Sequence, residues 1–219
     1  MGKKIIEMSN HLINLDFFKK ASFFYNSFTI KLPILLLIFL LHCNREKAIA
    51  QLAFEKEVQG YYTEAIYHYN QALKINPNYS FANARLGFLL SESQLSIIPA
   101  IHHLEKARSD SQDDTKISLK LIDLTLFILD FENGRRLQKE IANKISPETS
   151  ELITKIAECL EASTPKDKHK LMDEIDSMEF PPDTNMIYRS LALCYENGGE
   201  SVKAEEIVTN YRRTASLVH

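Results

Sequence analysis

Few side chains in this chain have the types and spacing that chemistry requires. His102 and His103 come nearest to a metal-binding pair, but adjacent residues on a helix point about 100° apart and cannot bind one ion together. Asp110, Asp113 and Asp114 form an acidic stretch that lacks the spacing of a calcium-binding loop. The sequence patterns of zinc proteases, serine hydrolases and phosphate-binding loops do not occur. We therefore expect no enzyme, no metal site, no cofactor and no small-molecule substrate.

Cys43 is the residue whose setting does suggest chemistry. It follows a charge-free apolar stretch, residues 32–41, which as a helix would span about 15 Å, half of the roughly 30 Å hydrocarbon core of a membrane. Five lysines precede Cys43, against only Glu7 and Asp16, which gives a positive segment of the kind that stays on the cytoplasmic side. This arrangement predicts the apolar core of a signal peptide that ends near Cys43.

The last four residues of this segment, Leu40-Leu41-His42-Cys43, resemble the lipobox of bacterial lipoproteins. In that family an apolar residue and two small ones precede a cysteine that is lipidated and becomes the first residue of the mature protein. Leu40 and Cys43 match, whereas His42 stands where the family has a small residue. The resemblance implies lipidation of Cys43 and attachment to the bacterial cell envelope, outside the cytoplasm. Two alternatives stay open: an uncleaved signal anchor over residues 21–43, and a plain hydrophobic N-terminus.

Composition places the rest of the chain among acidic, helical proteins. The 177 residues from Cys43 onward are enough for one domain with a core of its own. The first 43 residues contain five of the 26 basic and two of the 29 acidic residues, so the remainder has a net charge of −6. An acidic domain without a stripe of Lys and Arg argues against nucleic acid as a partner. With only six glycines and little strand-like alternation, an all-α fold is predicted.

Amphipathic helical hairpins recur along the chain. In the first hairpin Gly60 predicts the turn and Pro77 the end of the second helix. The second helix presents apolar or small residues on one face. These residues are Ala65, Ile66, Tyr69, Ala72 and Leu73.

The spacing of small and aromatic residues in these hairpins resembles the tetratricopeptide repeat, a helix–turn–helix unit of 34 residues. The first hairpin carries the pattern on Leu52, Ala53, Gly60, Tyr62, Ala65, Tyr69, Ala72 and Pro77. The second carries it on Leu86, Gly87, Leu90, Ala100, Ile101, Leu104 and Ala107, and the last on Tyr188, Leu191, Ala192, Tyr195, Gly199, Ala204 and Ile207. The resemblance implies a right-handed superhelical stack of hairpins.

The middle of the chain keeps the period with a weaker pattern. Pro147 and Pro181 lie one repeat length apart, and residues 117–131 are apolar on nearly every side, which predicts a helix buried among its neighbours. Asn133-Gly134 predicts the turn that follows. We expect about five hairpins behind a targeting segment at residues 1–43, within a repeat domain at 44–219. Their approximate ranges are 46–79, 80–114, 115–147, 148–181 and 182–217.

Cys159 and Cys194 fall at equivalent places, on the first helices of neighbouring hairpins. Because the axes of packed helices lie roughly 8–10 Å apart, we expect a disulfide between them to be strained. Both are therefore interpreted as buried thiols.

Binding is where the resemblance places function. In the family the first helix of each hairpin lines a concave groove that holds a peptide. The residues of this chain that should line it are Phe54, Glu57, Phe81, Arg85 and Phe88. Three aromatic rings with one cation and one anion favour an apolar segment flanked by charge. The carboxylate-clamp version of this groove needs Lys and Asn near Ala50 and Phe54. This chain has neither residue type at those positions.

The sequence thus predicts a non-enzymatic protein-binding scaffold of the cell envelope, lipid-anchored, whose protein or peptide partner is unknown. A second hypothesis is a structural envelope component that assembles with copies of itself. An exposed apolar face on the last helix, residues 200–217, would favour it.

Overall fold

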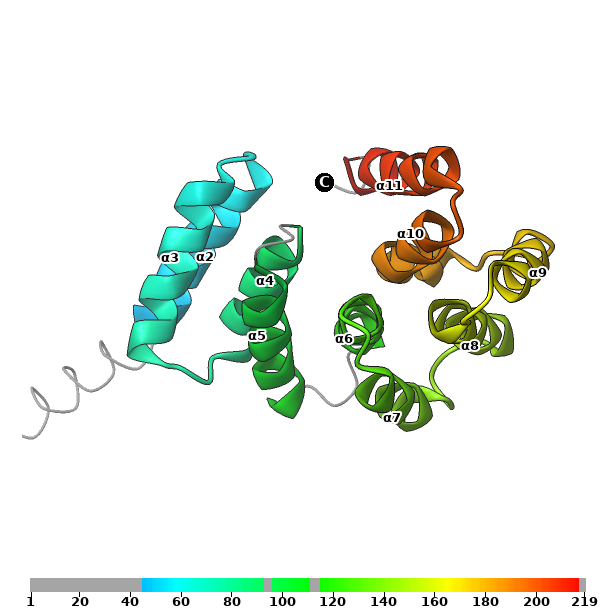
Figure 1. The fold of residues 1–219 in the computed structure, drawn as a ribbon. Helices are drawn as coiled ribbons and strands as arrows, with labels where there is room; N and C mark the ends of the chain where they lie inside the picture. Colours follow the sequence, from blue (N-terminus) through cyan, green and yellow to red (C-terminus); the bar gives the residue numbers. More distant parts are fainter. Residues whose placement is uncertain (1–44, 93–95, 111–114, 217–219) are drawn as a thin grey trace, which may run out of the picture. The chain divides into compact units, whose positions relative to one another are not determined.

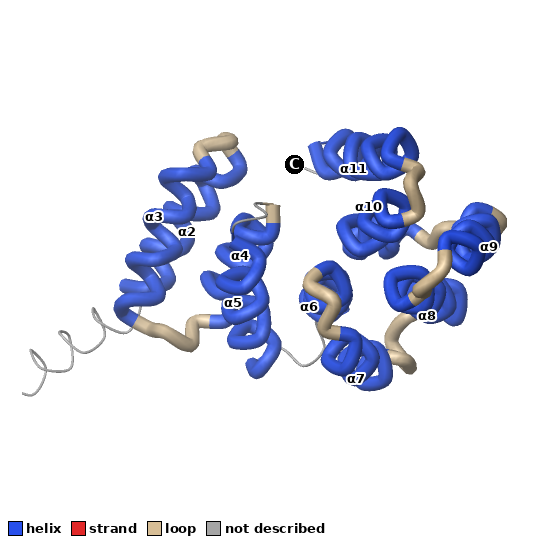
Figure 2. Tube along the Cα trace, in the orientation of Figure 1, coloured by secondary structure: helices blue, strands red, loops and turns tan. Residues whose placement is uncertain are grey.

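The computed structural model describes residues 45–92, 96–110 and 115–216. By its internal contacts the chain divides into two units, Met1–Ala48 and Ile49–His219, and only residues 45–48 of the first unit are described. Every regular element among the described residues is helical (Figure 2), so the predicted all-α class is confirmed for that part of the chain.

Across the described residues ten α-helices follow one another as five consecutive pairs (Figure 1). The first three pairs are α2 (Arg45–Val58) with α3 (Tyr62–Ile75), α4 (Ser80–Ser91) with α5 (Ile97–Asp110), and α6 (Thr115–Phe127) with α7 (Phe131–Ile141). The last two are α8 (Pro147–Glu161) with α9 (Pro165–Asp176), and α10 (Tyr188–Asn197) with α11 (Ser201–Ser216). A short 3₁₀ helix, η2 (Pro182–Ile187), leads into α10.

Local sequence explains where several of these helices begin and end. Gly60 follows α2 with a φ of +81°, a left-handed conformation that glycine adopts without a steric cost. Ser146 and Thr164 cap the starts of α8 and α9, where each hydroxyl accepts a hydrogen bond from the backbone N–H three residues on. A proline directly follows each cap, at the helix position where a missing N–H costs nothing.

The first three helices share one hydrophobic cluster, here the N-terminal cluster. Small residues dominate it, and its fully buried members include Ala53, Ala65, Ala72 and Tyr69, each 0 % exposed. These are four of the residues on which the repeat pattern was identified, and they are core positions, whereas Leu52 and Tyr62 of the same pattern are 40 % and 52 % exposed. The alanines allow the helices to approach closely while the Tyr69 ring fills the space between them.

The remaining helices, α5 to α11, share a second cluster, here the C-terminal cluster. At its centre α6 is buried over ten consecutive residues, from Ile117 to Leu126. The helix contacts α5 and α7, its neighbours in sequence, and also α10 and η2, which lie more than fifty residues away. Figure 1 shows α6 with α5, α7 and α10 around it. The prediction of a helix buried among its neighbours is confirmed for residues 117–126, but the helix ends at Phe127, and Ile128 and Leu129 are 38 % and 51 % exposed.

The turn predicted at Asn133-Gly134 is wrong. The chain reverses at 128–130 instead, where Leu129 has a φ of +63°, and Gly134 lies inside α7. A Cβ at Gly134 would lie 2.9 Å from a terminal methyl carbon of Leu126 on α6. This glycine therefore serves the close packing of α7 on α6, a role that a sequence cannot distinguish from a turn.

Candidate functional site

Four of the five predicted groove residues lie together where α2 meets α4. The rings of Phe54 and Phe81 pack edge to face, with centroids 6.0 Å apart. The Arg85 guanidinium carbon lies 5.1 Å from the centre of the Phe54 ring, a cation–π contact. Phe54 is partly buried and Phe81 is 38 % exposed, so the pair presents aromatic surface to solvent. We refer to Phe54, Phe81 and Arg85 as the aromatic face.

Glu57 supports this face from beneath and does not line it. Its carboxylate accepts a hydrogen bond of 2.7 Å from the Tyr69 hydroxyl, and it accepts two more from Arg85, of which the one from Nε is 3.0 Å long. Glu57 is only 6 % exposed, because Tyr69 and Arg85 enclose it. Burial, with the hydrogen bond to Glu57, raises the pKa of Tyr69 and keeps its hydroxyl protonated as a donor. The network therefore holds Arg85 above Phe54.

Phe88, the fifth predicted groove residue, does not join the others. It is partly buried and packs against the C-terminal cluster, whereas Phe54 packs against the N-terminal cluster. Its position one helical turn beyond Arg85 on α4 explains the difference, since α4 also contacts α6.

A second group of polar residues lies inside the C-terminal cluster. Lys120 and Asp123, one turn apart on α6, are 1 % and 0 % exposed, and the Lys120 Nζ lies 3.5 Å from Asp123 Oδ2. The other carboxylate oxygen, Oδ1, accepts hydrogen bonds from the backbone N–H and the hydroxyl of Ser190, at 2.8 Å and 2.9 Å. Burial lowers the pKa of Lys120 and raises that of Asp123, and the charge of each partner opposes the shift in the other.

Two tyrosines cover this pair. Tyr188 of α10 and Tyr211 of α11 stack with ring centroids 3.6 Å apart, and Lys120 Nζ lies 4.6 Å and 5.4 Å from the two ring centres. Both hydroxyls donate to Glu92 at the end of α4, over 3.1 Å to Oε2 and 3.3 Å to Oε1. Sequence patterns do not predict this group, because its members lie up to 119 residues apart. Its one signal was a Lys and an Asp one turn apart in an otherwise apolar helix.

A cleft of about 340 Å³ lies beside the stacked tyrosines. Both rings line it, together with residues from η2, α9, α10 and α11. Its other lining residues are Asp176, Phe180, Thr184, Asn185, Leu191, Tyr195, Lys203, Glu206, Ile207 and Asn210.

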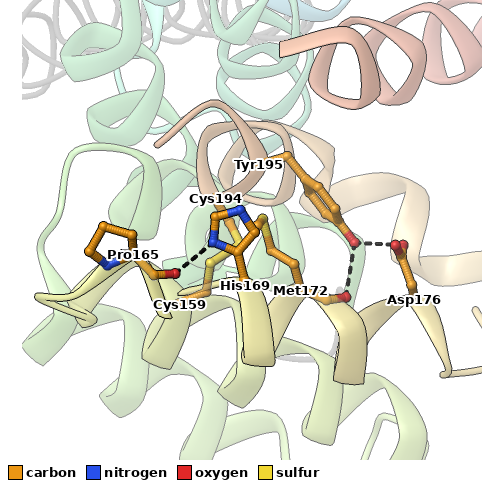
Figure 3. Close-up of a disulfide and its surroundings, with 7 residues drawn as sticks. All are labelled: Cys159, Pro165, His169, Met172, Asp176, Cys194 and Tyr195. Carbon is orange, nitrogen blue, oxygen red and sulfur yellow. Dashed lines mark hydrogen bonds between the residues drawn. A yellow bond between two sulfur atoms is a disulfide. The ribbon is translucent and has the colours of Figure 1, made fainter. Parts of the chain in front are cut away.

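Cys159 of α8 and Cys194 of α10 form a disulfide, with Cα atoms 5.8 Å apart (Figure 3). The interpretation of both as buried thiols is therefore wrong. An axis separation of about 8–10 Å leaves facing Cα atoms only about 3.4–5.4 Å apart, because each Cα lies about 2.3 Å from its own helix axis. The wider separations reach the ordinary Cα–Cα range for a disulfide, in which the observed 5.8 Å also lies.

The surroundings of the disulfide connect the last two helix pairs. Tyr195, next to Cys194, donates a hydrogen bond of 2.7 Å to Asp176 at the end of α9 (Figure 3). Gly198 directly follows the end of α10, and a Cβ at this position would lie 2.6 Å from the Met172 side chain on α9. The disulfide thus lies in a closely packed part of the molecule.

Several sequence predictions concern residues elsewhere. Cys43 and the apolar segment before it lie outside the described residues. Within those residues no helix is long and apolar enough to cross a membrane, and no group of three or more potential metal ligands occurs. His103 Nδ1 lies 2.9 Å from the Asn83 side-chain oxygen, a contact between α5 and α4.

Comparisons with known proteins give likenesses to solved structures alone. No protein-family model matches the chain, and no curated protein sequence matches it. A crystal structure of MamA protein superposes with a TM-score of 0.46 at 17 % sequence identity, covering 77 % of this chain and 90 % of that one.

Proposed function

We propose that this protein is a non-enzymatic scaffold that binds a protein or peptide on the aromatic face of its first two helix pairs. In this proposal the pairs are tetratricopeptide-like repeats in a superhelical stack. The first helices, α2 and α4, supply the groove. A bacterial lipid anchor on Cys43 holds the repeats at the cell envelope, outside the cytoplasm.

The observation that carries the binding proposal is the pre-ordered state of the aromatic face. Phe81 exposes 38 % of its surface, yet it packs against Phe54 and also lies 6.4 Å from the Tyr69 ring, centroid to centroid. Arg85 is fixed above Phe54 by the buried Glu57. Aromatic and arginine side chains that are already ordered lose little entropy when a partner binds, and these residue types are enriched in binding hot spots.

The disulfide supports the proposed location. Disulfides form and persist in oxidising compartments and are rare where the cytosol keeps thiols reduced. Cys159 and Cys194 are both 0 % exposed, so the bond is shielded from exchange with dissolved thiols. A signal segment that exports the repeats would bring these two cysteines into such a compartment.

Site-specific photo-crosslinking tests the binding proposal. A photoreactive phenylalanine analogue placed at Phe81 should crosslink a defined protein in cells. The same analogue at Tyr67 is a matched control, since Tyr67 is 60 % exposed on the second helix, α3. The double change Phe54→Ala and Arg85→Ala should reduce crosslinking at position 81, while circular dichroism stays nearly unchanged. Equal crosslinking from both positions would contradict the proposal.

Intact-mass analysis tests the anchor separately. Protein purified from membranes should begin at Cys43 and carry acyl chains, and a Cys43→Ala variant should lack both features. A full-length, unlipidated mass would contradict the lipidation proposal and favour a signal anchor.

Self-assembly through the last helix has less support. Of the apolar residues expected to form an exposed face on α11, Ile207 and Val208 pack against the C-terminal cluster, and Val202 is 84 % exposed. One exposed valine is ordinary for a protein surface. Light scattering that showed mass rising with concentration would restore this alternative.

A further inference from the structure

Glu92 occupies a site whose hydrogen-bond donors suit a carboxylate. Its two oxygens accept separate hydrogen bonds from Tyr188 and Tyr211, whose rings are stacked, and an Arg189 Nη lies 3.8 Å from Oε2. These donors come from α10 and α11, whereas Glu92 lies at the end of α4. A carboxylate with one phenol on each oxygen and a guanidinium alongside is bound by the geometry expected for recognition of an anion.

The site offers more hydrogen-bond donors than Glu92 satisfies, while Glu92 balances its charge. Lys120 Nζ and Arg189 Nε are both buried, and neither has a hydrogen-bond acceptor among the described atoms. Asp123 is the buried anion of this site. Its Oδ1 accepts hydrogen bonds from Ser190, and its Oδ2 faces Lys120. Without Glu92 the remaining charges, Lys120, Arg189 and Asp123, sum to +1 in a shielded position.

Glu92 itself is loosely held. Its side chain is 45 % exposed, the two hydrogen bonds of 3.1 Å and 3.3 Å are long for hydroxyl donors, and its ion pair with Arg189 spans 3.8 Å. An ion pair of such length whose carboxylate is half exposed to water contributes little to stability. The carboxylate of Glu92 can therefore leave without disturbing the packed rings beneath it.

The cleft of about 340 Å³ adjoins the site, because Tyr188 and Tyr211 line both. Phe180, Leu191 and Ile207 give the cleft apolar walls. We infer that this part of the molecule is a second binding site, for a protein segment in which an acidic side chain neighbours a bulky apolar one. The acidic side chain replaces Glu92 between the tyrosine hydroxyls and Arg189, and the apolar side chain enters the cleft. Glu92 acts as an internal competitor.

Fluorescence anisotropy with the purified full chain tests this inference. The probe is a fluorescein-labelled peptide of sequence Gly-Ser-Leu-Leu-Ser-Glu-Ser-Gly, with its glutamine counterpart as the uncharged control. Glu92→Ala should bind the glutamate peptide about tenfold more tightly than the wild-type chain, as expected when an internal competitor leaves a site open about a tenth of the time. Glu151→Ala, which removes an exposed negative charge from α8, should leave the affinity unchanged.

A second variant shows that the tyrosine hydroxyls bind the peptide. Adding Tyr211→Phe to Glu92→Ala retains the ring but removes one donor, and it should abolish most of the gain. The inference is overturned if Glu92→Ala binds no more tightly than wild type, or if it binds the glutamine peptide equally well. It is also overturned if inorganic phosphate competes as well as the peptide does, because the site would then recognise a small anion and not a protein segment.

Discussion

The N-terminal and C-terminal clusters use the first helices of their pairs in different ways. In the N-terminal cluster α2 and α4 meet over alanines, and their aromatic face stays open to solvent. In the C-terminal cluster α10, the first helix of the fifth pair, packs on α6, the first helix of the third. Asp123 of a buried ion pair on α6 accepts hydrogen bonds from Ser190 of α10, and a disulfide joins α10 to α8. Helices with the same repeat pattern can therefore either expose one face to a partner or bury that face against other helices of the same chain.

The buried ion pair should show this difference most strongly. Asp123→Ala would leave Lys120 without its counter-charge and Ser190 without its acceptor, and we expect a loss of about 3–5 kcal/mol in the free energy of unfolding. Urea denaturation measures this loss. The matched control is Glu174→Ala, which breaks the solvent-exposed pair with Lys155 and should cost far less. Equal losses of unfolding free energy for Asp123→Ala and Glu174→Ala would mean that water reaches the ion pair on α6.

The disulfide gives the next largest effect. Replacing both Cys159 and Cys194 with alanine should lower the unfolding free energy by about 2–4 kcal/mol, because the unfolded chain is no longer constrained. Chemical denaturation without reductant measures the change, and a reductant should give wild type a similar loss. Cys43→Ala should have no such effect. If the Cys159 and Cys194 variant is as stable as wild type in both conditions, the bond does not form in the native protein.

The polar network of the N-terminal cluster should be more tolerant. Tyr69→Phe removes one buried hydrogen bond to Glu57, but Arg85 still pairs with that carboxylate. We expect a loss of about 1–2 kcal/mol, measured by urea denaturation. A loss as large as that of Asp123→Ala would show that the two clusters depend equally on buried polar groups.

Alkaline pH gives the smallest effect. The raised pKa of Tyr69 means that the unfolded chain releases this phenol proton near pH 10 while the folded chain retains it, so stability falls as pH rises above 10. Between about pH 9 and about pH 11, Tyr69→Phe should lose about 1 kcal/mol less unfolding free energy than wild type. Identical losses for the two proteins would mean that Tyr69 is not buried as described.

The sequence was sufficient where local rules decide the structure. Burial of Ala53, Ala65 and Ala72 followed from the repeat pattern, and burial of α6 followed from its apolar residues. It was not sufficient where residues far apart in the chain meet. Nothing local to Glu92 indicates that two tyrosines of the last helix pair will bind it.

The predicted binding face illustrates the same limit. The resemblance to the tetratricopeptide repeat implies Phe54, Phe81 and Arg85 as groove residues, and the structure brings them together. The resemblance alone could not show that the Glu57 carboxylate would be occupied by Tyr69 and Arg85, or that Phe88 would face the other cluster. Helix-axis spacing does not predict the disulfide, because facing Cα atoms lie closer together than the helix axes do.

Hydrogen exchange of the full chain, with and without the partner identified by crosslinking at Phe81, tests the account most directly. If the aromatic face binds the partner, amides of α2 and α4 should gain protection, and those of the already buried α6 should change little. Protection gained at α6 but absent from α2 and α4 would contradict the account, because it would place the partner on a helix that the structure already buries.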